Sequence, residues 1–340
     1  MSAQTWLNGI WYDRGAPPAW LVPFSFAYAA IVAVRRRLYR RGWRRAGRLD
    51  CPVIVVGNLS VGGTGKTPLV CWLAGRLREL GWSPGIVTRG YGGRSANPRL
   101  VGPSDAAALV GDEPLLLALR AAVPVAVGRD RPAAGRLLLD AGCNVVLSDD
   151  GLQHYRLARD CEIIVVDGSR RFGNGWMLPA GPLREPVSRL GEADAVVVNG
   201  NEAGGPAGLP MRVVADHAVA LGDESAGPLS AFAGMVVHAI AGIGNPERFF
   251  TLLGAQGIEL IKHPRDDHAP LARADIVFPD ELPVLMTEKD AVKCKAFADK
   301  RHWYVPIDAA FDRDDATALL DIVVRGITAR NGSAAEVTHG

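Results

Sequence analysis

The stretch Val53–Val70, VIVVGNLSVGGTGKTPLV, decides the fold of this chain. It opens with four consecutive apolar residues, a composition typical of a strand that is buried on both faces in a parallel sheet. A glycine-rich turn, Gly57–Gly65, follows, and after Lys66 and Thr67 apolar residues recur at helical spacing. Strand, glycine-rich loop and helix come in the order of a phosphate-binding loop. We therefore predict an α/β fold of the phosphate-loop NTPase type, with a mostly parallel sheet flanked by helices.

The residue types of this loop suit ATP. Glycines let backbone N–H groups close around phosphate oxygens, and the N-terminal end of the new helix adds positive potential. Lys66 supplies a point charge, and the hydroxyl of Thr67 can ligate Mg²⁺. Ser60 stands where the usual G-x-x-x-x-G-K-[ST] pattern has its first glycine, and a glycine-rich turn without a ligand is the plain alternative. The flanking strand and helix favour a nucleotide site, whose predicted residues are Gly62, Gly63, Thr64, Gly65, Lys66 and Thr67.

Composition sets the broad class of the protein. With 340 residues, 48% hydrophobic and 22% charged, the chain has ample material for a core and for two lobes. A net charge of +2 is too small to suggest nucleic acid as the main partner. Its five cysteines are far apart and include no C-x-x-C pair, which favours a reducing compartment and argues against a disulfide framework or a cysteine metal site.

The N-terminal region combines an apolar run with a basic one. Residues 19–34 carry no charge, and seven arginines follow within residues 35–45. The apolar run is shorter than the ~20 residues that span a bilayer, and a signal peptide would carry its positive charge before the apolar part. We expect a helix in residues 1–45 that lies in or dips into the membrane surface, with its arginines on anionic head groups. A helix packed on the protein's own core, with a solvated basic end, is the alternative.

A second motif, which is acidic, indicates a metal site. The apolar strand Val145–Ser148 ends in Asp149 and Asp150, and in phosphate-loop enzymes a carboxylate at such a strand end holds Mg²⁺ or its water shell. Adjacent residues of an extended chain point to opposite sides, so one of the two aspartates is expected to touch the ion directly. The sequence does not say which one joins Thr67 as a ligand.

Polar residues at other strand ends extend the site. Arg89 and Tyr91 follow the predicted strand Gly85–Thr88 in a glycine-rich loop, either to meet a phosphate or a sugar or as part of a flexible turn. Asp112 precedes the predicted helix Leu115–Ala121, where an acidic residue is ordinary capping unless it faces the γ-phosphate. Arg131 precedes another helix and is available to neutralise phosphate charge.

The second half of the chain again alternates strand and helix, and three of its strand ends carry polar residues. His268 lies in a loop between two of these strands, and the preceding aspartate can tune its pKa and orient it. A stretch of linker composition, 200–208, marks a boundary. We predict an N-terminal membrane-associated helix (1–45), a nucleotide-binding core (46–205), a smaller C-terminal α/β lobe (206–330) and a frayed tail (331–340).

Taken in order, these motifs resemble those of the tetraacyldisaccharide 4'-kinases, enzymes of the lipid A pathway of Gram-negative bacteria. The resemblance runs from the N-terminus to about Phe311. Leu152 departs from it, because the family commonly has phenylalanine there, and the neighbours of His268 fit loosely. The matching motifs are Gly57–Asn58, Gly62–Pro68, Arg89–Gly92, Gly111–Pro114, Asp149–Gly151, Gln153–His154, Leu178–Pro186, Gly242–Pro246 and Thr287–Asp290.

The resemblance implies a kinase with ATP and Mg²⁺ as cofactors, peripheral or monotopic on the cytoplasmic face of the inner membrane. Its lipid substrate would be an acylated glucosamine disaccharide 1-phosphate, which receives the γ-phosphate on its 4'-hydroxyl to give lipid IVA. Catalysis would take place between the lobes, with Asp112 and His268 as a dyad and Lys66 on the phosphates. Residues assigned to the substrate are Arg89, Tyr91, Glu113, Arg131 and Gln153.

Two other classes of function remain as alternatives. One is a regulatory NTPase, such as a metallochaperone, although such proteins usually carry cysteine or histidine clusters, and the sequence offers none. The other is a membrane-surface binding module whose nucleotide site is only structural. The presence of Lys66, Thr67 and the paired aspartates argues against it, because a structural site does not require all of them.

Overall fold

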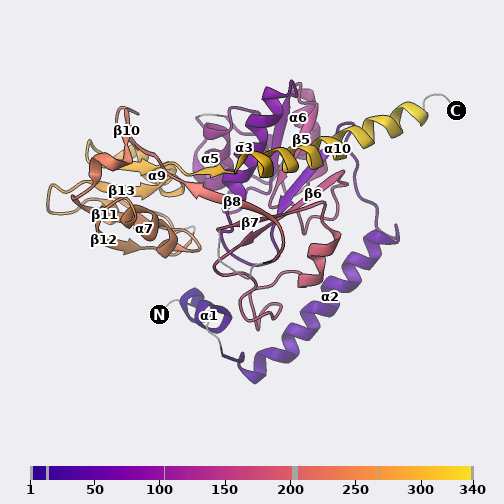
Figure 1. Cartoon of the computed structure of the whole chain (residues 1–340), viewed down its shortest axis with the longest axis horizontal. Helices are drawn as coiled ribbons and strands as arrows, with labels where there is room; N and C mark the ends of the chain where they lie inside the picture. Colours follow the sequence, from indigo (N-terminus) through magenta and orange to yellow (C-terminus); the bar gives the residue numbers. More distant parts are fainter. Residues whose placement is uncertain (1–2, 13–14, 103, 201–205, 268, 338–340) are drawn as a thin grey trace.

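The structure is a computed structural model that describes residues 3–12, 15–102, 104–200, 206–267 and 269–337. Two sheets organise it into a large and a small lobe, side by side (Figure 1). The large sheet has nine strands in the order β15-β8-β7-β6-β1-β5-β2-β4-β3, and the small one has six in the order β10-β9-β14-β13-β11-β12. Most neighbouring strands of the large sheet are parallel, which confirms the predicted α/β class.

The phosphate-loop strand lies at the centre of the large sheet. β1 (Val53–Gly57) pairs in parallel with β5 (Val145–Asp149) on one side and with β6 (Cys161–Asp167) on the other. The register sets Val56 opposite Asp149, so the glycine-rich loop and the acidic turn leave the same edge of the sheet. The other strands of this sheet's body are β2 (Pro84–Thr88), β3 (Arg99–Leu100), β4 (Val125–Val127) and β7 (Ala195–Asn199).

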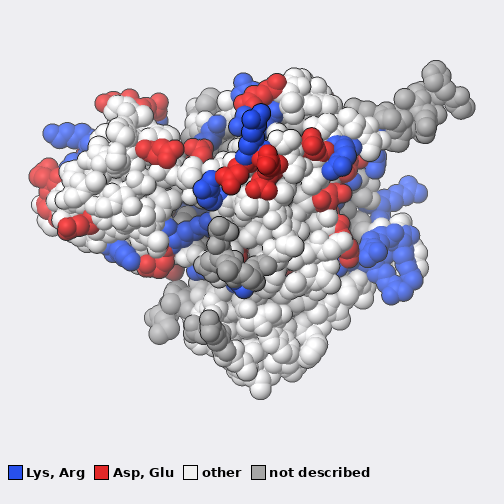
Figure 2. Space-filling view, in the orientation of Figure 1, with Lys and Arg blue, Asp and Glu red and all other residues white. Residues whose placement is uncertain are grey.

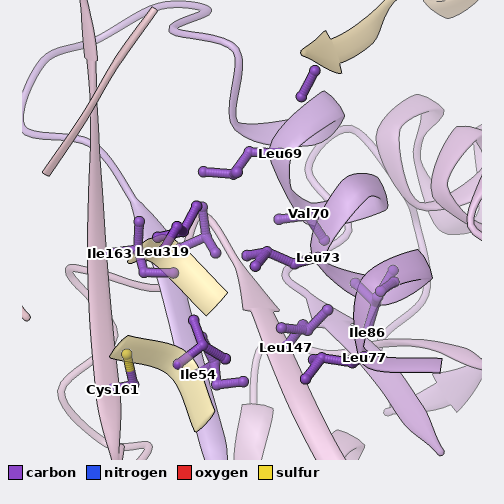
Figure 3. Packing of buried hydrophobic residues seen from close by; sticks show 14 of the residues in the cluster. Ile54, Leu69, Val70, Leu73, Leu77, Ile86, Leu147, Cys161, Ile163 and Leu319 are labelled. Carbon is purple, nitrogen blue, oxygen red and sulfur yellow. The ribbon is translucent and has the colours of Figure 1, made fainter. Parts of the chain in front are cut away.

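Helices on both faces bury the sheet. Leu69 and Leu73 of α3 (Lys66–Glu79) pack on Ile54 and Leu147 of the strands below, all fully buried (Figure 3). Burial of such side chains stabilises the fold by about 1.5–3 kcal/mol each, which fixes the helix start and with it the phosphate loop. Other helices of this lobe are α4 (Ala107–Val110), α5 (Asp112–Arg120), α6 (Arg131–Asp140) and η2 (Val187–Glu192).

The small lobe repeats the parallel arrangement around β11 (Val236–Ala241), and β9 and β10 add an antiparallel edge. Its core is separate from that of the large lobe and includes Phe249 and Phe250. Its elements are β9 (His217–Ala220), β10 (Ala226–Pro228), η3 (Leu229–Phe232), α7 (Pro246–Gly254), β12 (Glu259–Pro264), α8 (Arg273–Ile276), β13 (Val284–Thr287), α9 (Glu288–Cys294), η4 (Lys295–Phe297) and β14 (His302–Val305).

The chain does not pass from the large lobe to the small lobe at residue 206, where the sequence analysis placed the boundary. β8 (Leu209–Val214) and β15 (Asp308–Ala310) both belong to the large sheet, and α10 (Arg313–Val337) covers it. The physical reason is burial, because α10 contributes Leu319, Val323 and Ile327 to the core of the large lobe. α10 also continues through residues 331–337, which were expected to be a frayed tail.

The N-terminal helices lie against the large lobe along one side of the molecule (Figure 1). They are α1 (Ala3–Tyr12), η1 (Ala19–Leu21) and α2 (Val22–Arg40). Helix 19–40 is long and apolar enough, by length and composition alone, to cross a membrane. Only 11% of its apolar 18-residue stretch is buried. The apolar side chains are therefore not packed on the protein's own core, which disfavours that alternative.

Candidate active site

Two glycines and the side chain of Asn199 fix the conformation of the phosphate loop. Gly62 and Gly65 have positive φ angles of 107° and 92°, which favour glycine. A Cβ at Gly65 would also collide with the side chain of Asn199, which donates from Nδ2 to the carbonyl oxygen of Thr64 at 2.9 Å. The loop ends where Lys66 begins α3, so its N–H groups and the helix terminus face the same space.

The two aspartates after β5 have different partners. Asp150, with φ of 45°, receives two hydrogen bonds of 3.0 Å from the guanidinium of Arg184, and Lys66 Nζ lies 3.5 Å from its Oδ1. Asp149 is 1% exposed, and its Oδ1 has no hydrogen-bond partner among the described residues. One carboxylate is thus neutralised by the protein, while the other keeps a buried acceptor for something else.

Their pKa values diverge for the same reason. Burial raises the pKa of Asp149 to about 7, and the nearby carboxylate of Glu113 adds to the rise against the pull of Lys66. Burial acts on Asp150 too, but Lys66 and Arg184 outweigh it and hold the pKa of that carboxyl well below its usual range. Of the two carboxylates, Asp149 is therefore the one whose ionised form a neighbouring cation stabilises more.

The donor set around Asp149 fits a hard divalent cation. Within the described ranges no group of three or more His, Cys, Asp or Glu side chains forms a ready metal cage. Mg²⁺ commonly binds through one or two protein oxygens together with substrate phosphates, so it does not need such a cage. Among the described residues, the Oδ1 of Asp149 has no hydrogen-bond partner, and Thr67, the other predicted ligand, is the second residue of α3.

Lysines of the small lobe reach across to the large lobe. Lys289 Nζ lies 3.3 Å from Oε1 of Glu113 and 2.7 Å from Oδ1 of Asp267. Lys293 Nζ lies 3.6 Å from Oδ2 of Asp112. Both lysines come from α9, which packs against α5, so the start of α5 faces the small lobe at the edge where the phosphate loop lies.

His268, the predicted partner of Asp112, lies outside the described residues. Its neighbour Asp267 is described and belongs to the lysine-linked group above. Asp112 is at the first position of α5, after Gly111 with φ of 98°, where a Cβ would press on the carbonyl oxygen of Tyr91. The loop that carries Tyr91 therefore runs directly beside the turn that presents Asp112.

The residues predicted to meet the substrate fall into two groups. Arg89 is exposed, and Tyr91 is 61% exposed, at the end of β2. Arg131 is buried instead and donates to Ser148 Oγ at 2.8 Å and to the Asp150 carbonyl at 2.9 Å. Burial lowers the pKa of Arg131 to about 10.

Arg131 therefore supports the acidic turn from behind, and its guanidinium is not directed to the surface. Gln153 is half-buried, and its Nε2 donates to the Asn58 carbonyl at 3.0 Å. The side-chain amide of Gln153, like the guanidinium of Arg131, is therefore engaged by groups of the protein itself.

Sequence reasoning assigned no role to several residues that shape the site. Arg184 lies in the matching motif Leu178–Pro186, but its pairing with Asp150 depends on the tertiary fold. Asn199 ends a strand and could have been flagged by that position alone. Lys289 lies in the matching motif Thr287–Asp290, but neither it nor Lys293 was given a role, because each meets a carboxylate of α5 only when the lobes come together.

Comparisons with known proteins converge on one family. The family model for tetraacyldisaccharide-1-P 4'-kinase matches residues 18–325. Two curated tetraacyldisaccharide 4'-kinases are each 51% identical: that of Stenotrophomonas maltophilia (strain R551-3) over 92% of this chain and 94% of its own, and that of Alkalilimnicola ehrlichii over 89% and 92%. A crystal structure of LpxK from Aquifex aeolicus in complex with ATP is similar with a TM-score of 0.73 and 29% identity, over 90% of this chain and 98% of that one.

Proposed function

Because this chain belongs to the tetraacyldisaccharide 4'-kinase family, we propose that its interlobe site transfers the γ-phosphate of ATP to the 4'-hydroxyl of tetraacyldisaccharide 1-phosphate. The product is lipid IVA, an intermediate of lipid A biosynthesis. The enzyme is a kinase that uses ATP. In the proposed reaction the transfer is direct and in line.

One observation carries the assignment of the reacting groups. Lys289 joins Glu113, the residue after Asp112, to Asp267, the residue before His268. A lysine that links these two carboxylates supports a site in which the dyad residues come from opposite lobes. In this site Asp112 accepts the proton of the sugar hydroxyl, and His268 orients it.

The phosphates are held by the large lobe. Lys66 and the N–H groups of the phosphate loop bind the β- and γ-phosphates, aided by the positive end of α3. Arg184 keeps Asp150 in place beside Lys66, so the lysine is positioned before ATP arrives. Arg89 and Tyr91, both exposed at the end of β2, are assigned to the lipid substrate.

Asp149 and Thr67 are the proposed ligands of Mg²⁺. The unpartnered, buried oxygen of Asp149 supports this choice over Asp150, whose oxygens are already engaged by cations. When bound, the ion neutralises negative charge on the phosphate oxygens. Ionised Asp149 is the form that binds it, so loading the site releases any proton on that carboxyl.

The proposed place of action is the cytoplasmic face of the inner membrane. α2 exposes Phe24 (60%), Ile31 (66%) and Val34 (58%), and its last turns carry the arginines. Figure 2 shows Lys and Arg gathered at the C-terminal end of α2, beside a lower surface that carries almost no charge. This pattern suits a helix embedded in the interface with arginines on anionic head groups, close to acyl chains that stay in the bilayer.

The test is transfer of labelled γ-phosphate from ATP to tetraacyldisaccharide 1-phosphate in mixed micelles. We expect label in the lipid with the wild-type protein and its loss in Lys66→Ala. Lys300→Ala, which removes an exposed lysine of the small lobe, is the matched control and is expected to transfer label normally.

No label in the lipid, with ATP still bound and hydrolysed, would overturn the assignment of the acceptor. A regulatory NTPase would then be the better description. The absence of a metal-binding cluster in the described residues gives that alternative no cargo site of the metallochaperone kind.

A further inference from the structure

Residues 177–185, here called the connector, lie between α2 and the phosphate loop. On the α2 side, the hydroxyls of Ser25 and Tyr28 donate to connector carbonyls at 2.7 and 3.3 Å. Nε of Arg36 lies 3.7 Å from Oε2 of Glu185. The same guanidinium also pairs with Glu192, in η2, at 2.7 Å. These contacts anchor a helix that otherwise exposes most of its surface.

The opposite side of the connector is hydrogen-bonded to the phosphate loop itself. The N–H of Arg184 donates to the carbonyl of Leu59 at 2.6 Å, and the N–H of Val61 donates to the carbonyl of Pro182 at 2.8 Å. A short antiparallel bridge joins the two segments at this point. The connector therefore forms one wall of the loop that binds the phosphates.

Arg184 is bonded both to α2 and to the phosphate loop. The carbonyl of Arg184 accepts from Tyr28 on α2, its N–H donates to Leu59, and its guanidinium holds Asp150, which in turn lies 3.5 Å from Lys66. A change in how α2 sits must either move Arg184 or break one of these bonds.

Glu185 faces two guanidinium groups, because Nε of Arg189 lies 3.5 Å from the carboxylate oxygen that Arg36 approaches to 3.7 Å. The side chain of Glu185 is fully buried and also accepts a hydrogen bond from Gln153 at 3.2 Å. Gln153 in turn donates to the carbonyl of Asn58, the second residue of the glycine-rich turn. Leaving a buried carboxylate with one cation fewer is costly, so Glu185 ties the position of Arg36 to that of the loop.

We propose that the connector couples the seating of α2 on an anionic lipid surface to the geometry of the phosphate loop, so that ATP binds more tightly to the membrane-bound enzyme. Arg36 and Tyr28 act as positioning residues in this device. Lipid fixes the exposed apolar side of α2, which restrains the connector and holds Arg184 against Asp150 and Leu59. The inference rests on the membrane attachment in the proposed function.

The experiment measures the affinity of the full chain for a fluorescent ATP analogue with Mg²⁺ and no disaccharide lipid. Affinity is compared with and without vesicles of equal parts phosphatidylglycerol and phosphatidylethanolamine. We expect vesicles to raise the affinity of the wild type about fivefold, at the low end of ordinary allosteric coupling. Arg36→Gln is expected to remove that rise while the protein still sediments with vesicles.

Matched variants separate the coupling from plain charge. Arg40→Gln removes the same charge one turn further along α2, from a side chain that is 72% exposed, and should keep the rise. Arg36→Lys should restore part of it. Tyr28→Phe keeps the ring and the charge of α2 and removes only the bond to the Arg184 carbonyl, so it should reduce the rise at least about twofold, whether or not Arg36→Gln folds well.

The outcomes distinguish the proposals. Wild-type protein that sediments with vesicles but shows no change in ATP affinity would overturn the coupling and leave membrane attachment standing. Equal loss of the rise in Arg36→Gln and Arg40→Gln would also overturn it, because charge alone would then be responsible. Absence of sedimentation would overturn both, and failed label transfer with the vesicle response intact would count against the lipid acceptor alone.

Discussion

Lys66 Nζ lies 3.5 Å from Oδ1 of Asp150, so the lysine of the phosphate loop is paired with the second aspartate of the acidic turn. Arg184 completes this clamp with two hydrogen bonds of 3.0 Å. Asp149, one residue earlier, has a buried oxygen without a partner among the described residues. The two adjacent carboxylates thus have different environments, and we propose that Asp150 positions the lysine while Asp149 receives a cation.

Exchanging each aspartate for asparagine should separate these tasks. Asp149→Asn is expected to raise the Mg²⁺ concentration needed for half-maximal activity at least about tenfold, because it removes the proposed anionic ligand. Asp150→Asn should instead weaken ATP binding, since Lys66 and Arg184 lose their shared partner. Kinase activity titrated with Mg²⁺ at saturating ATP measures the first effect, and nucleotide titration measures the second. Equal Mg²⁺ dependence in the two variants would contradict the division.

The raised pKa of Asp149 predicts a pH dependence of stability without metal. The folded state keeps this carboxyl protonated up to about pH 7, whereas the unfolded chain ionises it near pH 4. The folded state therefore binds more protons across this window, so the free energy of unfolding falls as the pH rises through it. Glu288, whose pKa burial also raises to about 7, acts in the same direction.

Comparison with Asp149→Asn isolates the contribution of the one carboxyl. Thermal unfolding in a chelator, followed from about pH 5 to about pH 8, should show a steeper loss of stability in the wild type than in the variant. Added Mg²⁺ and ATP should reverse the loss at the alkaline end, because a cation stabilises ionised Asp149. Parallel curves for the two proteins would contradict the assignment.

Asp112 is expected to act in the chemical step. Asp112→Asn should lower the turnover about 10²- to 10⁴-fold, the range of general-base catalysis, with little change in ATP affinity. Lys293, whose Nζ lies 3.6 Å from Asp112 Oδ2, restrains the same carboxylate from α9, so Lys293→Met should cause a smaller loss. Steady-state kinetics and nucleotide titration on the same preparations check both. Near-normal turnover in Asp112→Asn would refute its role as the base.

Exposed apolar residues of α2 should control membrane binding and leave folding intact. Phe24→Ser and Ile31→Ser each remove a side chain worth about 1.5–3 kcal/mol when buried in lipid, a loss of at least tenfold in affinity. Leu80→Ser, at a 53% exposed position after α3, is the control for an exposed apolar residue away from that helix. Vesicle sedimentation and thermal unfolding are the measurements. Unchanged sedimentation of both α2 variants would rule out this face as the contact.

Local patterns were sufficient for the nucleotide half of the site. The strand, the glycine-rich turn and Lys66 at the start of α3 are as predicted, since each depends on residues close in sequence. The strands predicted at the start of Val53–Val70, at Gly85–Thr88 and at Val145–Ser148 are also present, with ends that differ by one residue. Arg131 shows the limit of such reasoning, because nothing in its neighbours indicates that its guanidinium is buried against Ser148.

The amino-acid sequence by itself determined the fold class, the phosphate loop, the acidic turn and the family, because these depend on short ordered motifs and on hydrophobic periodicity. Only the tertiary structure decided that Asp150 pairs with Lys66 and Arg184, while a buried oxygen of Asp149 has no partner within the described part of the chain. It alone returned β15 and α10 to the large lobe and placed the connector between α2 and the phosphate loop. The physical reason is that these relationships are contacts between segments far apart in the chain, set by burial and charge pairing that no local pattern encodes.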